Sequence, residues 1–149
     1  MFRTLLVPVL TLAAAGFAAP AAAHGSACAR PFQHAGTVVL RAGYSGAVGE
    51  FAVPAGKRLQ IEYVSAGLRL SNNDGRGAFA IGTSAGGTFA WHPLPVQVGY
   101  ALSDRQASTA VALYADAGSL VKLEINRASG TALAAVGRYA VTGCLFNVP

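Results

Sequence analysis

The stretch Arg58-Leu59-Gln60-Ile61-Glu62-Tyr63-Val64 decides the fold class, because apolar and polar side chains alternate along it. Such a period of two is the signature of a β-strand buried on one side only. The prediction places three apolar side chains on the buried face: Leu59, Ile61 and Tyr63. The stretch Leu120–Arg127 has the same pattern, with Val121, Leu123 and Ile125 alternating with Lys122, Glu124 and Asn126. Strands with one wet face favour an antiparallel sheet over a buried parallel one.

Outward from these two segments, short apolar stretches separated by turn residues predict further strands at 37–40, 50–53, 78–81, 88–91, 96–102 and 140–146. Loops or turns are expected at 43–49, at Pro54-Ala55-Gly56 and at 71–75. The segments 78–81 and 88–91 flank glycines and predict a hairpin. Pro93 and Pro95 exclude a central strand at that point and favour an edge or a crossover.

The stretch Ala101–Ala117 admits two interpretations. Ser103 and Gln106 match a capping box, and Gly118 is a suitable end for a helix. Against this, Val111 and Leu113 alternate with small residues as in a strand. We favour a turn at 103–106 followed by a strand, because a lone helix is inconsistent with so regular a β pattern.

Taken together, the strand spacing predicts an all-β fold, an antiparallel β-sandwich that is jelly-roll-like, formed as a single domain by residues 24–149.

The first 23 residues predict a signal peptide. Arg3 supplies the positive start, residues 5–17 are uncharged and apolar, and Ala21-Ala22-Ala23 fits the small-residue cleavage site. The apolar run is too short to span about 30 Å of hydrocarbon, which needs roughly 20 residues. The sequence therefore predicts a secreted or periplasmic protein whose processed chain begins at His24, with no transmembrane segment after processing.

The two cysteines, Cys28 and Cys144, predict one disulfide in an oxidising compartment, and with it that the first and last segments lie side by side. A lipid anchor on Cys28 is not expected, because Gly25 stands where a lipoprotein signal needs a Leu-like residue.

The chain carries 11 Lys and Arg residues against 6 Asp and Glu. These basic residues are scattered singly apart from Lys57-Arg58 and form no stripe for phosphates, so nucleic-acid binding is not expected.

The run Phe51-Ala-Val-Pro-Ala-Gly-Lys-Arg-Leu-Gln-Ile-Glu-Tyr-Val-Ser65 resembles a segment common in uncharacterised exported bacterial proteins of similar length. Tyr114–Ser119 is similar to their recurring turn after a strand, and Val141–Leu145 to their closing strand. The resemblance implies a β-sandwich and a bacterial source. It carries over no functional residue, because no activity is assigned to that group.

One candidate site is built on His24. As the first residue of the processed chain it offers an amino group and a ring nitrogen that can chelate copper, with His34 or His92 supplying a third nitrogen. That arrangement resembles the histidine brace of lytic polysaccharide monooxygenases and of some periplasmic copper carriers. The alternative is a solvated N-terminal histidine.

A second candidate is Trp91, which lies beside prolines on a predicted edge. Tyr44, Phe79, Phe89 and Tyr100 are the other aromatic residues considered for a sugar-binding platform. Aromatic side chains in small β domains more often belong to the core, yet they are enriched at binding surfaces. Trp91 is therefore a possible ligand contact.

Three further patterns are set aside. Gly82-Thr83-Ser84-Ala85-Gly86 matches a hydrolase nucleophile elbow, but no helix is predicted after it and no histidine follows Asp104 or Asp116, so a hairpin loop is expected. Glu62 and Glu124 are interpreted as solvated strand residues and not as a glycosidase pair. Asn72-Asn73-Asp74-Gly75 holds one carboxylate, too few for calcium.

The sequence thus predicts no catalytic residue and no resident cofactor. The expected function is a non-catalytic structural or binding module whose partner is an envelope or extracellular protein or a glycan. A copper-binding protein and a carbohydrate-binding module are the two alternatives.

Overall fold

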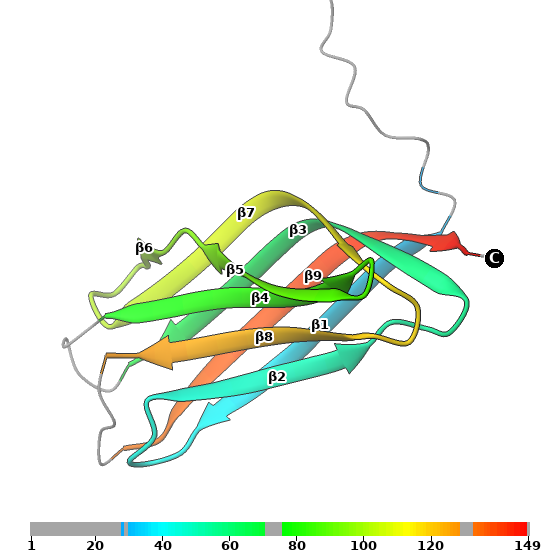
Figure 1. Ribbon diagram of the computed structural model, residues 1–149. Helices are drawn as coiled ribbons and strands as arrows, with labels where there is room; N and C mark the ends of the chain where they lie inside the picture. The colour runs from blue at the N-terminus through cyan, green and yellow to red at the C-terminus, as the bar shows by residue number, and fades with distance from the viewer. Residues whose placement is uncertain (1–27, 29, 71–75, 129–132, 149) are drawn as a thin grey trace, which may run out of the picture.

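The computed structural model describes residues 28, 30–70, 76–128 and 133–148 as two antiparallel β-sheets packed face to face (Figure 1). The strands are β1 Pro31–Leu40, β2 Gly46–Ala52, β3 Lys57–Arg69, β4 Gly77–Ala85, β5 Thr88–Leu94, β6 Gln97–Val98, β7 Asp104–Ala115, β8 Leu120–Arg127 and β9 Ala135–Asn147. The predicted all-β antiparallel sandwich is confirmed. The proposed signal peptide, residues 1–23, lies outside the described residues.

The chain passes repeatedly from one sheet to the other. The five-stranded sheet has the order β1-β9-β3-β7-β6, and the four-stranded sheet, nearer the viewer in Figure 1, has the order β2-β8-β4-β5. All strand pairs are antiparallel, and β4 and β5 are the only consecutive neighbours in the four-stranded sheet. This connectivity brings the first and last strands together, because β1 pairs with β9 from Pro31↔Cys144 to Leu40↔Ala135.

The core lies between the sheets and is formed by the inward residues of both. Within β8, Val121, Leu123 and Ile125 are fully buried, as their alternation predicted. They pack in one cluster with side chains from the other sheet, among them Leu40, Leu59, Ile61, Val64 and Val141. Burial of such side chains contributes about 1.5–3 kcal/mol each and is the main force that holds the two sheets together.

The alternation in β3 does not run through unbroken. Leu59 and Ile61 are fully buried as predicted, but Tyr63 faces outward and is 41% exposed, so its predicted inward position was wrong. The reason is a β-bulge, at which Ile61 pairs with Gly143 and Tyr63 pairs with the next residue, Thr142. The unpaired Glu62 shifts the phase by one residue, and Val64, Ala66 and Leu68 continue the buried face.

Gly143 is required at this bulge. A Cβ atom built on it lies 1.9 Å from the carbonyl oxygen of Gln60, which belongs to the backbone and cannot rotate away. β9 and β3 therefore approach each other here as only glycine allows.

Residues 101–117 contain a strand and not a helix, as favoured, and β7 already begins at Asp104. The predicted turn at 103–106 was therefore wrong for residues 104–106, and other predicted boundaries were wrong as well. Only Gln97–Val98 of the predicted strand 96–102 pairs with a neighbour. The predicted loop 43–49 ends early, because β2 begins at Gly46 and pairs with β8 from there. The predicted turn at 71–75 lies outside the described residues.

The predicted hairpin is formed by β4 and β5, and β5 with its Pro93 is an edge strand. Gly82–Ala85 belong to β4 and not to the expected loop; the turn itself is made by Gly86 and Gly87, both with positive φ. Positive φ is accessible to glycine without a steric penalty.

The disulfide predicted between Cys28 and Cys144 is present, with the two Cα atoms 5.6 Å apart. It joins the segment before β1 to β9 and fits an oxidising compartment. Among the described residues, no helix is long and apolar enough to cross a membrane.

Candidate functional site

An aromatic platform, formed by Phe89 and Trp91 of edge strand β5, lies on the outer face of the four-stranded sheet. The two rings meet edge to face with their centroids 5.3 Å apart. Phe89 is 43% exposed and Trp91 is 42% exposed, so about half of each side chain remains available to a ligand.

Gly82 of β4 makes room for both rings. It pairs directly with Trp91, and a Cβ on it would lie 2.5 Å from the tip of the Phe89 ring and 2.9 Å from the Trp91 ring. Because there is no Cβ, both rings can approach the backbone at Gly82, although their planes stand at 89° to each other. The platform is therefore supported from below by β4, with one ring edge-on to the other.

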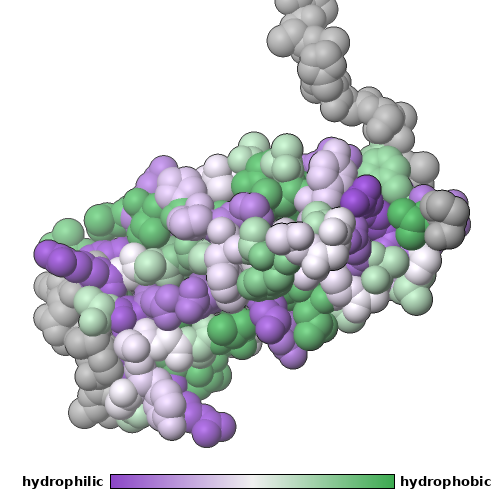
Figure 2. All heavy atoms as spheres, in the orientation of Figure 1, coloured by the Kyte–Doolittle hydropathy of each residue, from purple (hydrophilic) through white to green (hydrophobic). Residues whose placement is uncertain are grey.

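Polar side chains border the platform on β8. Lys122 pairs with Gly82, and its ammonium lies 5.9 Å from the centroid of the Phe89 ring. Glu50 pairs with Lys122 from the other side, and Glu124 lies two residues further along β8. Figure 2 shows this side of the molecule as a mosaic of hydrophobic and hydrophilic residues. The platform thus combines apolar rings with nearby donors and acceptors.

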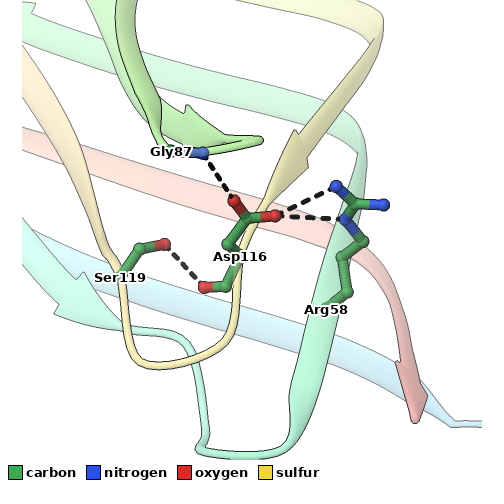
Figure 3. A network of polar contacts seen from close by, with 4 residues as sticks. All are labelled: Arg58, Gly87, Asp116 and Ser119. Carbon is green, nitrogen blue, oxygen red and sulfur yellow. Dashed lines mark hydrogen bonds and ion pairs between the residues drawn. The ribbon is translucent and has the colours of Figure 1, made fainter. Parts of the chain in front are cut away.

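A network around Asp116 fixes the end of the sandwich next to the platform's hairpin (Figure 3). One carboxylate oxygen accepts hydrogen bonds from Arg58 Nε at 3.2 Å and Nη2 at 3.0 Å, and the other accepts the Gly87 N–H at 3.3 Å. The Ser119 hydroxyl donates to the Asp116 carbonyl oxygen at 2.7 Å. The network ties β3 of one sheet to the β4–β5 turn of the other.

The Gly87 N–H, together with the Arg58 guanidinium, holds the pKa of the Asp116 carboxyl below its ordinary value, against the opposing effect of desolvation. Asp116 is therefore charged at neutral pH and acts as an inter-sheet tie. It is not poised as an acid or base near neutrality.

The two described histidines lie at opposite edges of the sandwich. His34 on β1 stacks on Phe51, with ring centroids 4.2 Å apart. His92 on β5 faces Thr83, 3.5 Å away, and lines a cleft of about 250 Å³ between β5 and β7. Three strand spacings, about 14 Å, separate the two edges, so one metal ion cannot bind both rings.

The third residue of the predicted copper site, His24, lies outside the described residues, and the site stays a prediction. Over the described part of the chain, no three His, Cys, Asp or Glu side chains are close enough to hold a metal ion.

Glu62 and Glu124 do not come together. Glu62 lies at the bulge on the outside of the five-stranded sheet, whereas Glu124 is on the outer face of the four-stranded sheet. The whole sandwich separates them. Of the other aromatic candidates, Phe79 is buried in the core, and Tyr44 and Tyr100 are exposed in connecting segments away from the platform. Asn72-Asn73-Asp74-Gly75 lies outside the described residues.

Arg127 was not anticipated from the sequence. It continues the buried face of β8 and is only 5% exposed. Its guanidinium donates hydrogen bonds of 2.8–2.9 Å to the carbonyl oxygens of Tyr44, Leu133 and Arg41. Its position two residues beyond Ile125 places it on the buried face of the alternating pattern, which could have predicted its burial. A charged residue at a strand end is usually interpreted as solvated, however.

Comparison of the chain with protein-family models and with curated proteins found no match.

Proposed function

We propose that this chain is an exported, non-catalytic binding module that holds a carbohydrate on the aromatic platform. The observation that carries the proposal is the pair of half-exposed rings, Phe89 and Trp91, seated over Gly82. Large apolar side chains exposed together on a folded domain mark a contact surface more often than isolated ones do.

Carbohydrate is the ligand class that suits this surface best. A sugar ring presents an apolar face of C–H groups, which packs on an aromatic ring, and a rim of hydroxyls, which need polar partners. Trp91 and Phe89 supply the first, since aromatic rings offer a large contact area at a low cost in side-chain entropy. Lys122 and Glu124 supply a donor and an acceptor on β8, the strand on the other side of β4.

Export is supported by two independent features. The Cys28–Cys144 disulfide persists in oxidising compartments and is rare in the cytosol. The N-terminal residues 1–23 carry the pattern of a cleaved signal peptide. A secreted or periplasmic module meets the glycans of the envelope and of the extracellular space.

The test is a panel of soluble glycans, with neutral plant, fungal and bacterial-wall oligosaccharides, screened by affinity electrophoresis and followed by calorimetry. We expect one class to be retained, and Trp91→Ala to weaken its binding at least roughly tenfold, because a buried aromatic contact contributes more than about 1.4 kcal/mol.

Tyr100→Ala is the matched control, since Tyr100 is a fully exposed aromatic residue away from the platform. Retention of no glycan, or equal affinity of the Trp91→Ala and wild-type proteins, would overturn the proposal. Robust turnover of a retained glycan, abolished by a single side-chain change, would overturn its non-catalytic part.

A further inference from the structure

Gly67, two residues before the end of the central strand β3, has no structural reason to be glycine. Among the glycines of the described residues, each of the others either has a positive φ or has an atom within about 3 Å of where a Cβ would be. At Gly67 the nearest atom is the Arg105 carbonyl oxygen at 3.9 Å, an ordinary contact, and φ is not positive. Glycine inside a strand weakens it and often marks a place where a ligand approaches the backbone.

The register places Gly67 at the centre of a grid of outward-facing residues on the five-stranded sheet. Gly67 itself lies between Arg138 of β9 and Gln106 of β7. One row further along β3, Arg69 lies between Val136 and Asp104, and one row back, Ser65 lies between Ala140 and Ser108. Small side chains thus form a floor around Gly67, and longer polar ones form the rim.

Two adjoining surface depressions of about 370 and 380 Å³ meet at this grid, and both are lined by Gly67, Gln106 and Arg138. Each has the volume of a small ligand site. The missing side chain at Gly67 is what leaves this part of the sheet open.

The charges at the rim favour an anion. Within the described residues, the Arg138 guanidinium makes no hydrogen bond or ion pair, and the side chain of Arg69 is 81% exposed with its Nε 3.8 Å from Asp104 Oδ1. Guanidinium groups pair with carboxylates through two parallel hydrogen bonds. Two guanidinium groups therefore face one carboxylate.

Asp104 is already engaged within the chain. Its Oδ2 atom accepts the Ala101 N–H at 3.4 Å, and its buried Oδ1 atom, which accepts no hydrogen bond from the described residues, lies 3.8 Å from Arg69 Nε. A ligand does not reach a buried oxygen atom, so Asp104 balances the charge of Arg69. Arg138 is therefore the cation at this rim that is left for an anionic ligand.

We propose that the depression around Gly67 binds an acidic sugar, with its carboxylate on the Arg138 guanidinium and its ring over the floor at Gly67; the choice of a sugar rests on the proposed function. The site lies on the outer face of the sheet opposite to the platform, so it stands or falls independently of Trp91. The two surfaces together let one domain hold two segments of glycan.

The probe is D-glucuronate, titrated into the full processed protein and followed by amide NMR shifts, with D-glucose and inorganic phosphate as comparison ligands. We expect saturable shifts for glucuronate centred on the amides of Gly67, Ser65 and Ala140. Gly67→Leu, which fills the floor, and Arg138→Gln, which removes the cation, are each expected to weaken binding at least roughly tenfold.

Trp91→Ala is the control and is expected to leave glucuronate binding unchanged, which separates failure of this proposal from failure of the platform. Gly67→Leu is also expected to melt no lower than the wild type, because nothing occupies the space that it fills. Should it fail to fold, Arg138→Gln alone decides the matter. The proposal is overturned if glucuronate does not bind, if neither variant weakens it, or if glucose or phosphate binds the same amides equally well.

Discussion

Removal of the Cys28–Cys144 disulfide is expected to cost the domain a large part of its stability. The bridge spans a sequence separation of 116 residues. In the chain-entropy description, closing a loop of that length restricts the unfolded chain enough to contribute about 5 kcal/mol at room temperature. For a domain of this size, such a loss lowers Tm by about 20 °C. Typical domains have only about 5–15 kcal/mol in total.

The expected loss of stability comes from the greater freedom of the unfolded chain and not from a change in the folded sandwich. β1 pairs with β9 through backbone hydrogen bonds over its whole length, so we expect the folded sandwich to keep its register when the sulfur atoms are removed. The variant to make is Cys28→Ser with Cys144→Ala, since Cys28 is exposed and Cys144 is fully buried.

Urea unfolding followed by far-ultraviolet circular dichroism measures the difference, with reduced wild-type protein as the control. Both should show a β spectrum and unfold at a much lower denaturant concentration than the oxidised protein. A loss of less than about 1 kcal/mol, or a variant that loses its β spectrum in water, would refute the reasoning.

Three further predictions concern single residues. Gly143→Ala should destabilise the domain by about 2 kcal/mol or more in urea unfolding, because the new Cβ meets the Gln60 backbone. Gly67→Ala is the control, since its Cβ meets nothing closer than 3.9 Å, and it should change stability by less than about 0.5 kcal/mol. Equal effects of the two substitutions would contradict the bulge geometry. Arg127→Met should cost about 2–4 kcal/mol, because it leaves the carbonyl oxygens of Tyr44, Leu133 and Arg41 without this donor; a Tm equal to that of the wild type would refute this. The pKa of Asp116 is lowered in the folded protein, so the stabilising effect of its carboxylate is fully present above the ordinary pKa of 3.8 and is lost as pH falls through the folded pKa. The Tm difference between wild type and Asp116→Asn should therefore shrink below about pH 4. A Tm difference that stays constant from about pH 6 to about pH 2.5 would contradict the network.

The fold class was predictable because alternation is a local property. In β8, Val121, Leu123 and Ile125 are buried as the pattern requires, and nothing distant in the chain is needed to see this. The same local rule misplaced Tyr63, because the bulge that shifts its phase is produced by how β9 approaches β3 at Gly143. That approach depends on two strands far apart in the sequence.

The sites were predictable only in part for the same reason. The edge position of Trp91 was predictable from the neighbouring prolines, and its role as a ligand contact stays a prediction. Its contact with Gly82 depends on the register in which β4 and β5 pair, and the sequence of one strand alone does not determine that register. The grid around Gly67 likewise needs three strands in register, and no residue in it is unusual when taken alone. The burial of Arg127 was not predicted, because charged residues are usually exposed.

Trp91 is the sole tryptophan of the chain, so its fluorescence reports on the platform without interference. Titration of the retained neutral glycan, with emission and acrylamide quenching recorded at each step, is the most direct measurement. Occupation of the platform should shift the emission to shorter wavelength and reduce quenching, with the same midpoint as calorimetry gives. Calorimetric binding that leaves both the emission and the quenching of Trp91 unchanged would place the ligand elsewhere and contradict the account.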